Sequence, residues 1–406
     1  MPPSSIRGDF ALKQTNRMHI CHVITRLIVG GAQENTVLTC RGLIERGHRV
    51  TLIAGPETGP EGSLWSDASQ TGCELIEVEA LRRAVHPLRD WRATRDLGRI
   101  FEEIRPDVVH THSSKAGIVA RFAAARAGVP AIVHTIHGMS FNRTQTAPTR
   151  WLYRTLERRA ARCTTAFVSV ADAMTDQAVA AGLAPRDRFT TIRSGMRTDQ
   201  FEPRPEARRR YRNTWKVGPD DVVVGTIARL FENKGYEEII DALPTAVARE
   251  PRLRFVWVGD GLHRRRYERQ LESLGLDDRV HLCGLVQPEE VPLLISGFDM
   301  VVHASRWEGL PRTVVQGLLC EVPAISFDND GAPEVVIPNE TGILLPYGDT
   351  QGLARAVVEL ARDAARRNAL GKRGRARCLE MFDWRVMAEQ LDALYARVAP
   401  SRSTVV

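Results

Sequence analysis

The 406 residues of the chain contain two series of short apolar runs. Each run is followed by a stretch with helical periodicity. This alternation is typical of parallel α/β units, in which a helix connects each strand to the next. The candidate strands are residues 19–27, 49–54, 108–111, 131–135 and 166–170 in the first series, and residues 222–227, 254–258, 280–283, 300–303 and 322–327 in the second. A chain of this length suits two domains of about 150–200 residues each. We therefore predict an α/β protein with two Rossmann-like domains that face each other across a cleft.

The composition of residues 201–221, rich in Pro, Arg and Asp, predicts a linker between the two series. The last helical stretch, residues 384–398, has no strand after it, so we expect it to cross back and pack on the first domain. We expect a disordered arm (residues 1–17), an N-terminal Rossmann-like domain (18–200) and a C-terminal Rossmann-like domain (201–383). The crossover helix (384–398) and a flexible tail (399–406) follow.

The cysteines and the apolar runs indicate the compartment. Seven cysteines are scattered without a paired short spacing, which indicates small core residues and argues against a disulfide framework or a zinc site. No apolar run reaches the roughly 18 residues of a membrane span, and residues 1–17 lack the apolar stretch of a secretory signal. We therefore expect a cytoplasmic protein.

A net charge of +7 indicates an anionic partner. Residues 121–163 contain eight arginines and a single acid, Glu157. Between Arg143 and Arg162 these arginines alternate with apolar residues in the pattern of a basic amphipathic helix, which would rest on an anionic membrane surface. Alternatively, the apolar face packs on the sheet and the arginines are only solvated. No nucleic-acid-binding motif accompanies the charge, so we expect no nucleic-acid partner.

Ligands of open parallel sheets bind beyond the carboxyl ends of the strands, so residues that follow candidate strands are candidate site residues. Gly30 and Gly31 follow the first strand and precede a helix, where a bare backbone and free N–H groups suit a diphosphate or a sugar hydroxyl. The candidates after the next strands of this half are His110, His112, Ser113, Lys115 and His137. Alternate strand residues point the same way, so both histidines of the first pair would face one ligand. Since no carboxylate or cysteine is near them in the sequence, we reject a metal site.

The second half supplies charged candidates. Arg229 follows residues 222–227, and Lys234 stands at the head of the next helix. A guanidinium clamps phosphate oxygens and an ammonium adds a point charge, so together they suit a departing diphosphate. Glu308 lies in a loop bounded by Gly and Pro, with Gln316 about two helical turns beyond it. The other candidates in turns after strands are Gly259, Val286, Gly309, Leu310 and Glu334.

In order and spacing these residues resemble the family 4 glycosyltransferases. The resemblance runs over residues 19–398 and is carried by Gly30-Gly31, His112, Arg229 with Lys234, Glu308 with Gln316, and Gly331 with Glu334. It implies the GT-B fold and a retaining, metal-independent enzyme without a cofactor, whose N-terminal domain binds the acceptor and whose C-terminal domain binds a nucleotide-sugar. The stretch from His110 to Gly117 is most similar to bacterial members that build exopolysaccharide or capsule. The expected donor is then a UDP-sugar and the expected acceptor a saccharide or a lipid-linked sugar.

The resemblance also implies a role for each candidate. The donor site would comprise Gly30, Gly31, Arg229, Lys234, Gly259, Val286, Glu308, Gly309, Leu310, Gln316 and Glu334, the acceptor site His110, Ser113, Lys115 and His137, and the catalytic set His112, Arg229, Lys234 and Glu308. The family usually has a second Glu where this chain has Gln316. An amide still donates to and accepts from a ribose hydroxyl, so we expect a binding role there. The Asp328-Asn329-Asp330 triplet has the D-x-D form of metal-dependent glycosyltransferases, but before Gly331 we interpret it as a polar turn.

Retention without an enzymic nucleophile indicates front-face substitution, in which the departing phosphate takes the acceptor proton. Two alternatives remain open. One is a nucleotide-sugar 2-epimerase on the same fold, and the other is a degenerate sugar-nucleotide-binding protein, which Gln316 would suit. A phosphorylase would need a lysine for pyridoxal phosphate and a much longer chain.

Overall fold

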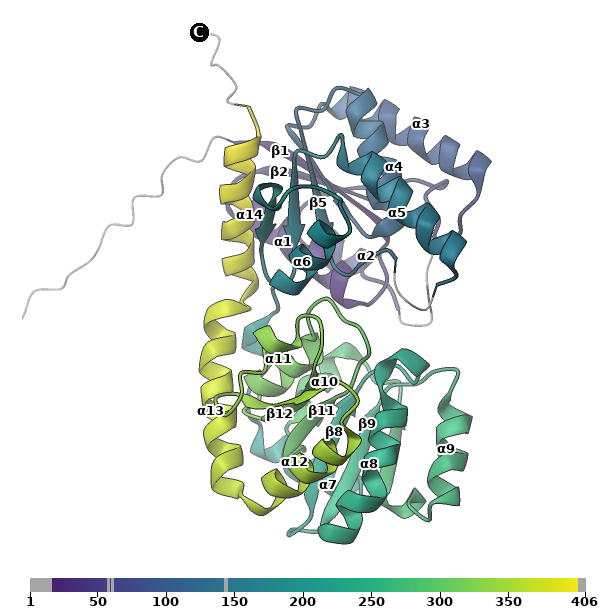
Figure 1. Cartoon of the computed structure of the whole chain (residues 1–406). Helices are drawn as coiled ribbons and strands as arrows, with labels where there is room; N and C mark the ends of the chain where they lie inside the picture. Colours follow the sequence, from purple (N-terminus) through teal and green to yellow (C-terminus); the bar gives the residue numbers. More distant parts are fainter. Residues whose placement is uncertain (1–16, 57–58, 60–61, 142–144, 401–406) are drawn as a thin grey trace, which may run out of the picture.

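The computed structural model describes residues 17–56, 59, 62–141 and 145–400. The two expected α/β domains lie one above the other, with the N-terminal domain on top (Figure 1). Apart from Arg17, the predicted arm lies outside the described residues, as do Arg143 and residues 401–406. Within the described ranges, no helix combines the length and apolar character that crossing a bilayer requires.

Seven parallel strands form the sheet of the N-terminal domain, in the order β3-β2-β1-β4-β5-β6-β7. The strands are β1 (His19–Arg26), β2 (Arg49–Gly55), β3 (Glu74–Glu77), β4 (Val108–His112), β5 (Ala131–Ile136), β6 (Ala166–Ser169) and β7 (Phe189–Thr191). The helices are α1 (Gly31–Glu45), α2 (Trp65–Ser69), α3 (Pro87–Ile104), α4 (Ser114–Arg126), α5 (Ala147–Ala161) and α6 (Asp172–Ala180). All residues of the central strand β4 are buried, as expected for a parallel sheet covered on both faces.

Six parallel strands form the second sheet, in the order β10-β9-β8-β11-β12-β13. They are β8 (Val222–Ile227), β9 (Leu253–Val258), β10 (Val280–Gly284), β11 (Met300–His303), β12 (Ala324–Asp328) and β13 (Gly342–Pro346). The helices of this half are α7 (Pro205–Thr214), α8 (Tyr236–Arg249), α9 (Arg264–Ser273), α10 (Val291–Ile295), α11 (Arg312–Leu319), α12 (Thr350–Arg362) and α13 (Ala364–Met381). Because β8 and β11 are neighbours, the loops that follow them meet at one edge of the sheet.

The expected return of the last helix to the first domain is confirmed. Figure 1 shows α13 and then α14 (Trp384–Val398), both in yellow, running along one side of the two domains. Trp384, Met387, Leu391 and Tyr395 are buried in the apolar core of the N-terminal domain, together with residues of β1, β2 and α1. This helix therefore completes a core that the first half of the chain begins.

The predicted linker is wrong over most of its length. Residues 205–214 form α7, which begins at a proline in the first turn, a position that proline favours. Trp215 packs on Phe298 with ring centroids 5.6 Å apart, and Arg212 pairs with Asp299 at 3.0 Å. The Pro, Arg and Asp that suggested a linker instead begin a helix and bind it to the second domain.

Three strands were not anticipated, namely β3, β7 and β13. All three are edge strands, so each pairs on one side only. Most of their residues are half-buried or exposed, and β3 and β7 lack the dense apolar run that marks a central strand.

Candidate functional site

Lys234 and Glu308 meet at the carboxyl edge of the second sheet. Lys234 ends the short helix η3 (Glu232–Lys234) that follows β8, and Glu308 lies in the loop between β11 and α11. The Lys234 ammonium donates to Oε1 of Glu308, and the Ser305 hydroxyl donates to the same oxygen at 3.1 Å. His303 Nε2 lies 4.0 Å from that oxygen. The sheet order thus brings together two residues that are 74 positions apart in sequence.

The charges of this group follow from its surroundings. Burial raises the pKa of the Glu308 carboxyl, but the Lys234 ammonium, His303 and the hydrogen bonds outweigh burial, so the pKa lies below its ordinary value. Burial lowers the pKa of His303 to about 4, because the opposing effect of Glu308 is smaller. At neutral pH the site therefore holds an ionised Lys234–Glu308 pair beside a neutral imidazole.

Arg229 and the predicted glycines lie along the same edge. Arg229 follows β8 by two residues, is exposed, and its guanidinium lies over the Phe231 ring, 5.0 Å from the centroid. Gly259 has a φ of 128°, and a Cβ there would come 2.2 Å from the Ala228 carbonyl oxygen. Only glycine permits this close approach of the two loops. Val286 is partly buried against the core, and Gln316 is half-buried in the second turn of α11.

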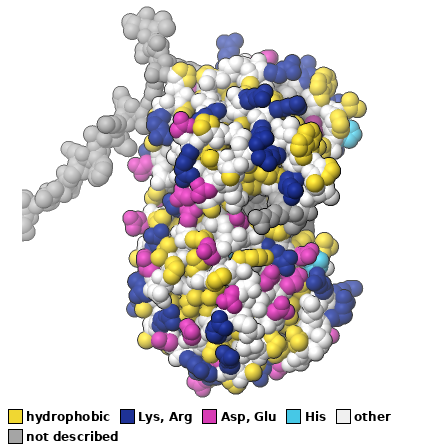
Figure 2. All heavy atoms as spheres, in the orientation of Figure 1, with side chains coloured by type: hydrophobic (Ala, Val, Ile, Leu, Met, Phe, Trp, Pro, Cys, Tyr) yellow, Lys and Arg dark blue, Asp and Glu magenta, His cyan; other side chains and the backbone are white. Residues whose placement is uncertain are grey.

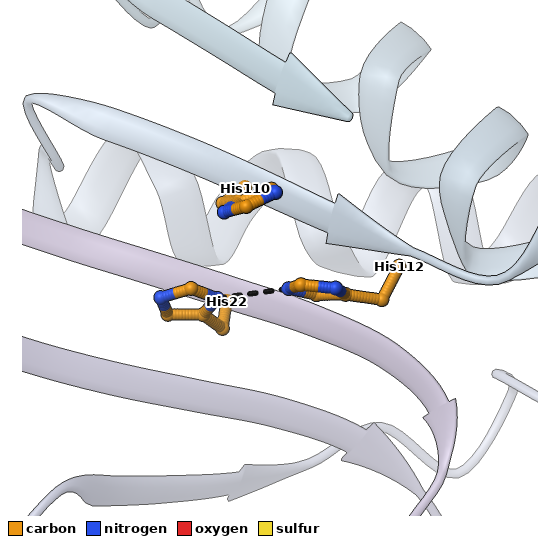
Figure 3. Close-up of side chains that lie close together, drawn as sticks. All are labelled: His22, His110 and His112. Atoms are coloured by element: carbon orange, nitrogen blue, oxygen red, sulfur yellow. Dashed lines mark hydrogen bonds between the residues drawn. The ribbon is translucent and has the colours of Figure 1, made fainter. Parts of the chain in front are cut away.

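A chain of hydrogen-bonded histidines occupies the corresponding edge of the first sheet. His22 of β1 lies opposite His110 of β4 in the strand register. Figure 3 shows the rings of His22 and His112 pointing toward each other, with Nδ1 of His22 2.9 Å from Nε2 of His112. His112 Nδ1 lies 3.1 Å from His137 Nε2, so the chain continues to the loop after β5. Sequence reasoning missed His22, although it is one of two histidines in the otherwise apolar start of β1.

Burial keeps these rings neutral. It lowers the pKa of His22 and of His137 to about 3, and with the neighbouring histidines it lowers the pKa of His112 well below its ordinary value. A neutral imidazole carries one N–H, so His112, which contacts a ring on each side, donates one hydrogen bond and accepts the other. Nε2 of His22 is buried without a partner among the described residues, and buried donors without a partner are rarer than acceptors. We therefore place the proton of His22 on Nδ1, which makes His112 donate to His137.

His110 lies beside this chain but serves the fold. Its Nδ1 lies 2.5 Å from the Tyr395 hydroxyl of α14, and its Nε2 lies 2.6 Å from the Thr135 hydroxyl. The side chain is fully buried, so in this structure it offers no group to an acceptor, contrary to the expected role. Ligand nitrogens of His22, His110 and His112 lie within 4.8 Å of one another, close enough to hold a metal ion. Most of these nitrogens are engaged in the hydrogen bonds just described.

The other predicted acceptor residues lie around His112. The Ser113 and Thr25 hydroxyls are 2.7 Å apart, and Ser113 and His137 both line a small cavity of about 40 Å³. Lys115 pairs with Asp90 and donates to the Ala84 carbonyl at 3.2 Å. The structure thus brings His112, His137 and Ser113 together, with Lys115 beside them on α4.

The predicted role of Glu334 at the sugar does not match its position. Its carboxylate accepts from the Ala173 backbone N–H at 3.3 Å and from Arg193 at 2.8 Å, both in the N-terminal domain. Burial raises the pKa of Glu334, and the contacts with Ala173 and Arg193 only partly oppose this. Side-chain direction across a domain interface cannot be deduced from spacing alone. In this structure Glu334 joins the two domains.

Further contacts close the two edges on each other. Asp330 accepts from Gln177 of α6 at 2.7 Å and from the Glu308 backbone N–H at 2.7 Å, so the predicted polar turn also positions the site. Arg312 of α11 donates to Glu34 of α1 at 2.7 Å. A Cβ at Gly31 would come 2.6 Å from the Arg312 side chain. The absence of a side chain at Gly31 therefore leaves room for Arg312 of the other domain.

Gly309 packs directly against the backbone of the first domain. A Cβ at Gly309 would come 2.0 Å from the His137 carbonyl oxygen, which no other residue could tolerate. Leu310 next to it is buried in the shared core. Beside this contact a cavity of about 990 Å³ opens between the domains. Its lining includes Met139, Arg150, Trp151, Arg154, Gln177, Arg306, Trp307 and Asp330.

Two family models match the chain. The one described as glycosyl transferases group 1 matches residues 207–377, and the glycosyl transferase 4-like domain matches residues 30–195. The UDP-Gal:alpha-D-GlcNAc-diphosphoundecaprenol alpha-1,3-galactosyltransferase of Escherichia coli is 25% identical over 389 residues, which cover 95% of this chain and 98% of that protein. A GDP-mannose-dependent alpha-(1-6)-phosphatidylinositol monomannoside mannosyltransferase of Mycolicibacterium smegmatis is 30% identical over 278 residues, or 67% of this chain and 71% of that protein.

The solved structures agree on the architecture. The crystal structure of HepE from Anabaena in complex with UDP and glucose has a TM-score of 0.78 with this chain at 21% identity. The similarity covers 93% of this chain and 99% of HepE. The arrangement of two facing Rossmann-like domains is therefore shared over nearly the whole length of both proteins.

Proposed function

Since this chain belongs to the family 4 glycosyltransferases of the GT-B fold, we propose that it transfers a sugar, with retention of configuration, from a UDP-sugar to a lipid-linked or saccharide acceptor. That the enzyme is a glycosyltransferase using a nucleotide-sugar follows from the family. The named relatives transfer sugars, so the epimerase alternative is not favoured. UDP as the donor nucleotide is supported by the E. coli relative, whose name specifies UDP-Gal.

The observation that carries this proposal is the ionised Lys234–Glu308 pair at the edge of the second sheet. Lys234 and Arg229 hold the donor diphosphate and stabilise its charge as the bond from the anomeric carbon to phosphate breaks. Glu308 accepts a hydrogen bond from a hydroxyl of the transferred sugar, and Gln316 binds the ribose. Leu310 and Gly309 offer backbone N–H groups to the same sugar.

The acceptor side of the reaction lies on the first domain. The acceptor hydroxyl attacks the anomeric carbon from the face that the phosphate leaves, and its proton passes to the departing phosphate oxygen. His137, the ring at the outer end of the histidine chain, contacts the sugars, and His112 behind it fixes its orientation. His112 is a positioning residue on this account, because only 1% of it is exposed.

The test is a donor screen with matched variants. Thermal stabilisation by UDP-, GDP- and ADP-sugars identifies the donor, since a ligand at 100 times its Kd adds about 2.7 kcal/mol. Lys234→Met should then lower kcat at least 100-fold, whereas Lys372→Met, which removes an exposed lysine of α13, should leave turnover within twofold. Unchanged turnover in Lys234→Met would refute the assigned site.

We also propose that the transfer needs no metal ion. The cations at the diphosphate are then Lys234 and Arg229, as required if no divalent ion bridges the phosphates. Dialysis against EDTA should leave turnover within twofold. Loss of turnover that Zn²⁺ or Mn²⁺ restores would contradict this and would point to the ring nitrogens of His22, His110 and His112.

An anionic membrane surface is the proposed partner of α5. Trp151 and Leu152 are 68% and 47% exposed, as the amphipathic pattern requires. Arg154 and Arg158 instead donate to the Ala181 carbonyl at the end of α6, so only part of the arginine-rich stretch is available to lipid. Binding to vesicles of anionic phospholipid that weakens with salt would support the contact, and no binding at low salt would refute it.

A further inference from the structure

A second large cavity, of about 780 Å³, lies wholly within the N-terminal domain. It is lined by Arg26, Pro56, Arg82, Arg83, Ala84, Val85 and Tyr153. These residues come from the ends of β1 and β2, from the segment between β3 and α3, and from α5. The cavity therefore opens at the carboxyl edge of the first sheet, where parallel sheets bind ligands. Apart from Tyr153 of α5, none of its lining residues belongs to the sites assigned above.

The lining of this cavity is cationic. It contains three guanidinium groups and no carboxylate among the described residues. Arg82 forms an ion pair with Glu79, but the two side chains are 34% and 73% exposed, so a phosphate can replace the carboxylate easily. Guanidinium groups bind phosphate oxygens in pairs, and several of them around one cavity favour a ligand with more than one negative charge.

Two contacts join the cavity to the acceptor residues. Arg26 directly follows Thr25, whose hydroxyl is 2.7 Å from that of Ser113. On the other wall, Lys115 donates to the carbonyl of Ala84 at 3.2 Å. Helix α5 then leads from this cavity, through Tyr153, to the cavity between the domains, through Trp151. A ligand bound here lies beside the residues proposed to hold the acceptor.

Exposed apolar side chains continue from this lining along the chain. Val85, which lines the cavity, and Leu88 and Trp91, in the first turns of α3, are 64%, 69% and 60% exposed. Figure 2 shows hydrophobic and basic side chains gathered on the upper lobe, over the region where Figure 1 draws α3 and α5. Exposed apolar groups beside an anion site suit an amphiphile better than a free phosphate.

We propose that this cavity binds the diphosphate of a prenyl diphosphate-linked acceptor. Arg26, Arg82 and Arg83 hold the phosphate oxygens. The prenyl chain leaves over Val85, Leu88 and Trp91 toward the bilayer, and the sugar end points toward Ser113 and His137. This rests on the proposed function, because it defines the chemical class of acceptor for the same reaction.

Farnesyl diphosphate is the probe, and its binding to the full-length protein is measured by calorimetry. Arg82→Ser/Arg83→Ser is the test variant. Arg92→Ser/Arg99→Ser, on the exposed face of α3, removes the same charge from the same domain and is the matched control. Lys234→Met reports whether the probe enters the donor site instead. Inorganic pyrophosphate tests the diphosphate without the prenyl chain, and farnesyl monophosphate tests the prenyl chain with a single phosphate. Phosphatidylglycerol vesicles test binding to a bilayer.

We expect the Kd for farnesyl diphosphate to rise at least tenfold in the test variant and to stay within twofold in the control and in Lys234→Met. Pyrophosphate and farnesyl monophosphate should each bind wild type at least tenfold more weakly. The proposal would be overturned by an equal Kd in the test variant and the control, or by a loss of farnesyl diphosphate binding in Lys234→Met alone. It would also be overturned if both double variants lost binding of farnesyl diphosphate and of vesicles in parallel. Donor stabilisation is measured on the same proteins. Its absence in wild type refutes the proposed function, whereas its persistence with an unchanged Kd refutes only this inference.

Discussion

At the scale of single residues, the Lys234 ammonium and the Glu308 carboxylate depend on each other. Their side chains are only 16% and 26% exposed, and charges so far removed from water are stable chiefly as a pair. The pair also fixes both groups in place before a donor arrives, which is the condition for electrostatic stabilisation of a leaving group. The geometry of the site therefore has a measurable effect on stability.

Lys234→Met should destabilise the protein by about 1–3 kcal/mol at pH 7, because Glu308 loses its partner. The folded-state pKa of Glu308 lies below the ordinary 4.5, so its ionised form stabilises wild type above that pH and the effect is lost as pH falls through the folded pKa. The difference in Tm between wild type and variant should therefore shrink from pH 7 to pH 4. Thermal unfolding at both pH values measures it, and a difference that grows on acidification would contradict the pairing.

The buried histidines should make the fold sensitive to acid. The pKa of His22 is about 3 in the folded protein against 6.5 ordinarily, so below pH 6.5 the unfolded chain binds a proton that the folded chain does not. Each such ring lowers the free energy of unfolding by about 1.4 kcal/mol per pH unit. Between pH 6.5 and pH 5, the free energy of unfolding of His22→Phe should therefore fall by about 1–2 kcal/mol less than that of wild type. Urea unfolding across this range tests it, and the exposed His86→Ser should keep the wild-type slope.

At the scale of elements, α14 shows what the sequence could predict. Its bounds coincide with the predicted stretch because Asp383 caps the first turn, and Trp384, Met387, Leu391 and Leu394 give one continuous apolar face. The edge strand β3 lacked such a signal, and α7 was concealed by its polar composition. At the site, the family resemblance predicted that Lys234 and Glu308 belong to one donor site, but the strand order that brings them together was not predicted. The direction of Glu334 depended on the docked first domain and was not predictable.

Tyr395→Phe should destabilise the protein by about 1–3 kcal/mol, because Nδ1 of the buried His110 loses its partner. Tyr347→Phe is the control, since Tyr347 is 49% exposed and its hydroxyl is 3.5 Å from Glu238. Chemical denaturation of the three proteins measures the difference. Equal midpoints would show that the hydroxyl of α14 does not stabilise the first domain.

At the scale of the whole molecule, the two domains are held closed on the site. Glu334 with Arg193, Asp330 with Gln177, and Arg312 with Glu34 each join one domain to the other. All three contacts are made by segments of the C-terminal domain that lie next to the Glu308 loop. Separating these contacts would open the site, as in other enzymes whose domains close on a ligand.

Arg312→Ala should favour the open arrangement, because the variant loses both the Glu34 pair and the bond to the Gly195 carbonyl. We expect a larger radius of gyration by small-angle scattering and a KM for the donor that rises several-fold, with a smaller change in kcat. Arg95→Ala, which removes an exposed ion pair within the first domain, should scatter as wild type does. Superimposable curves for all three proteins would show that Arg312 does not hold the domains together.

The return of α14 to the first domain has a consequence for biosynthesis. Residues 17–200 leave the ribosome before residues 201–383, yet the core of the N-terminal domain still lacks Trp384, Leu391 and Tyr395, which follow the second domain in the sequence. The half that is synthesised early must therefore wait, partly folded, while the second half emerges and folds. A fragment that ends before residue 384 should be a poor folder, and a peptide of residues 384–400 supplied in trans should rescue it.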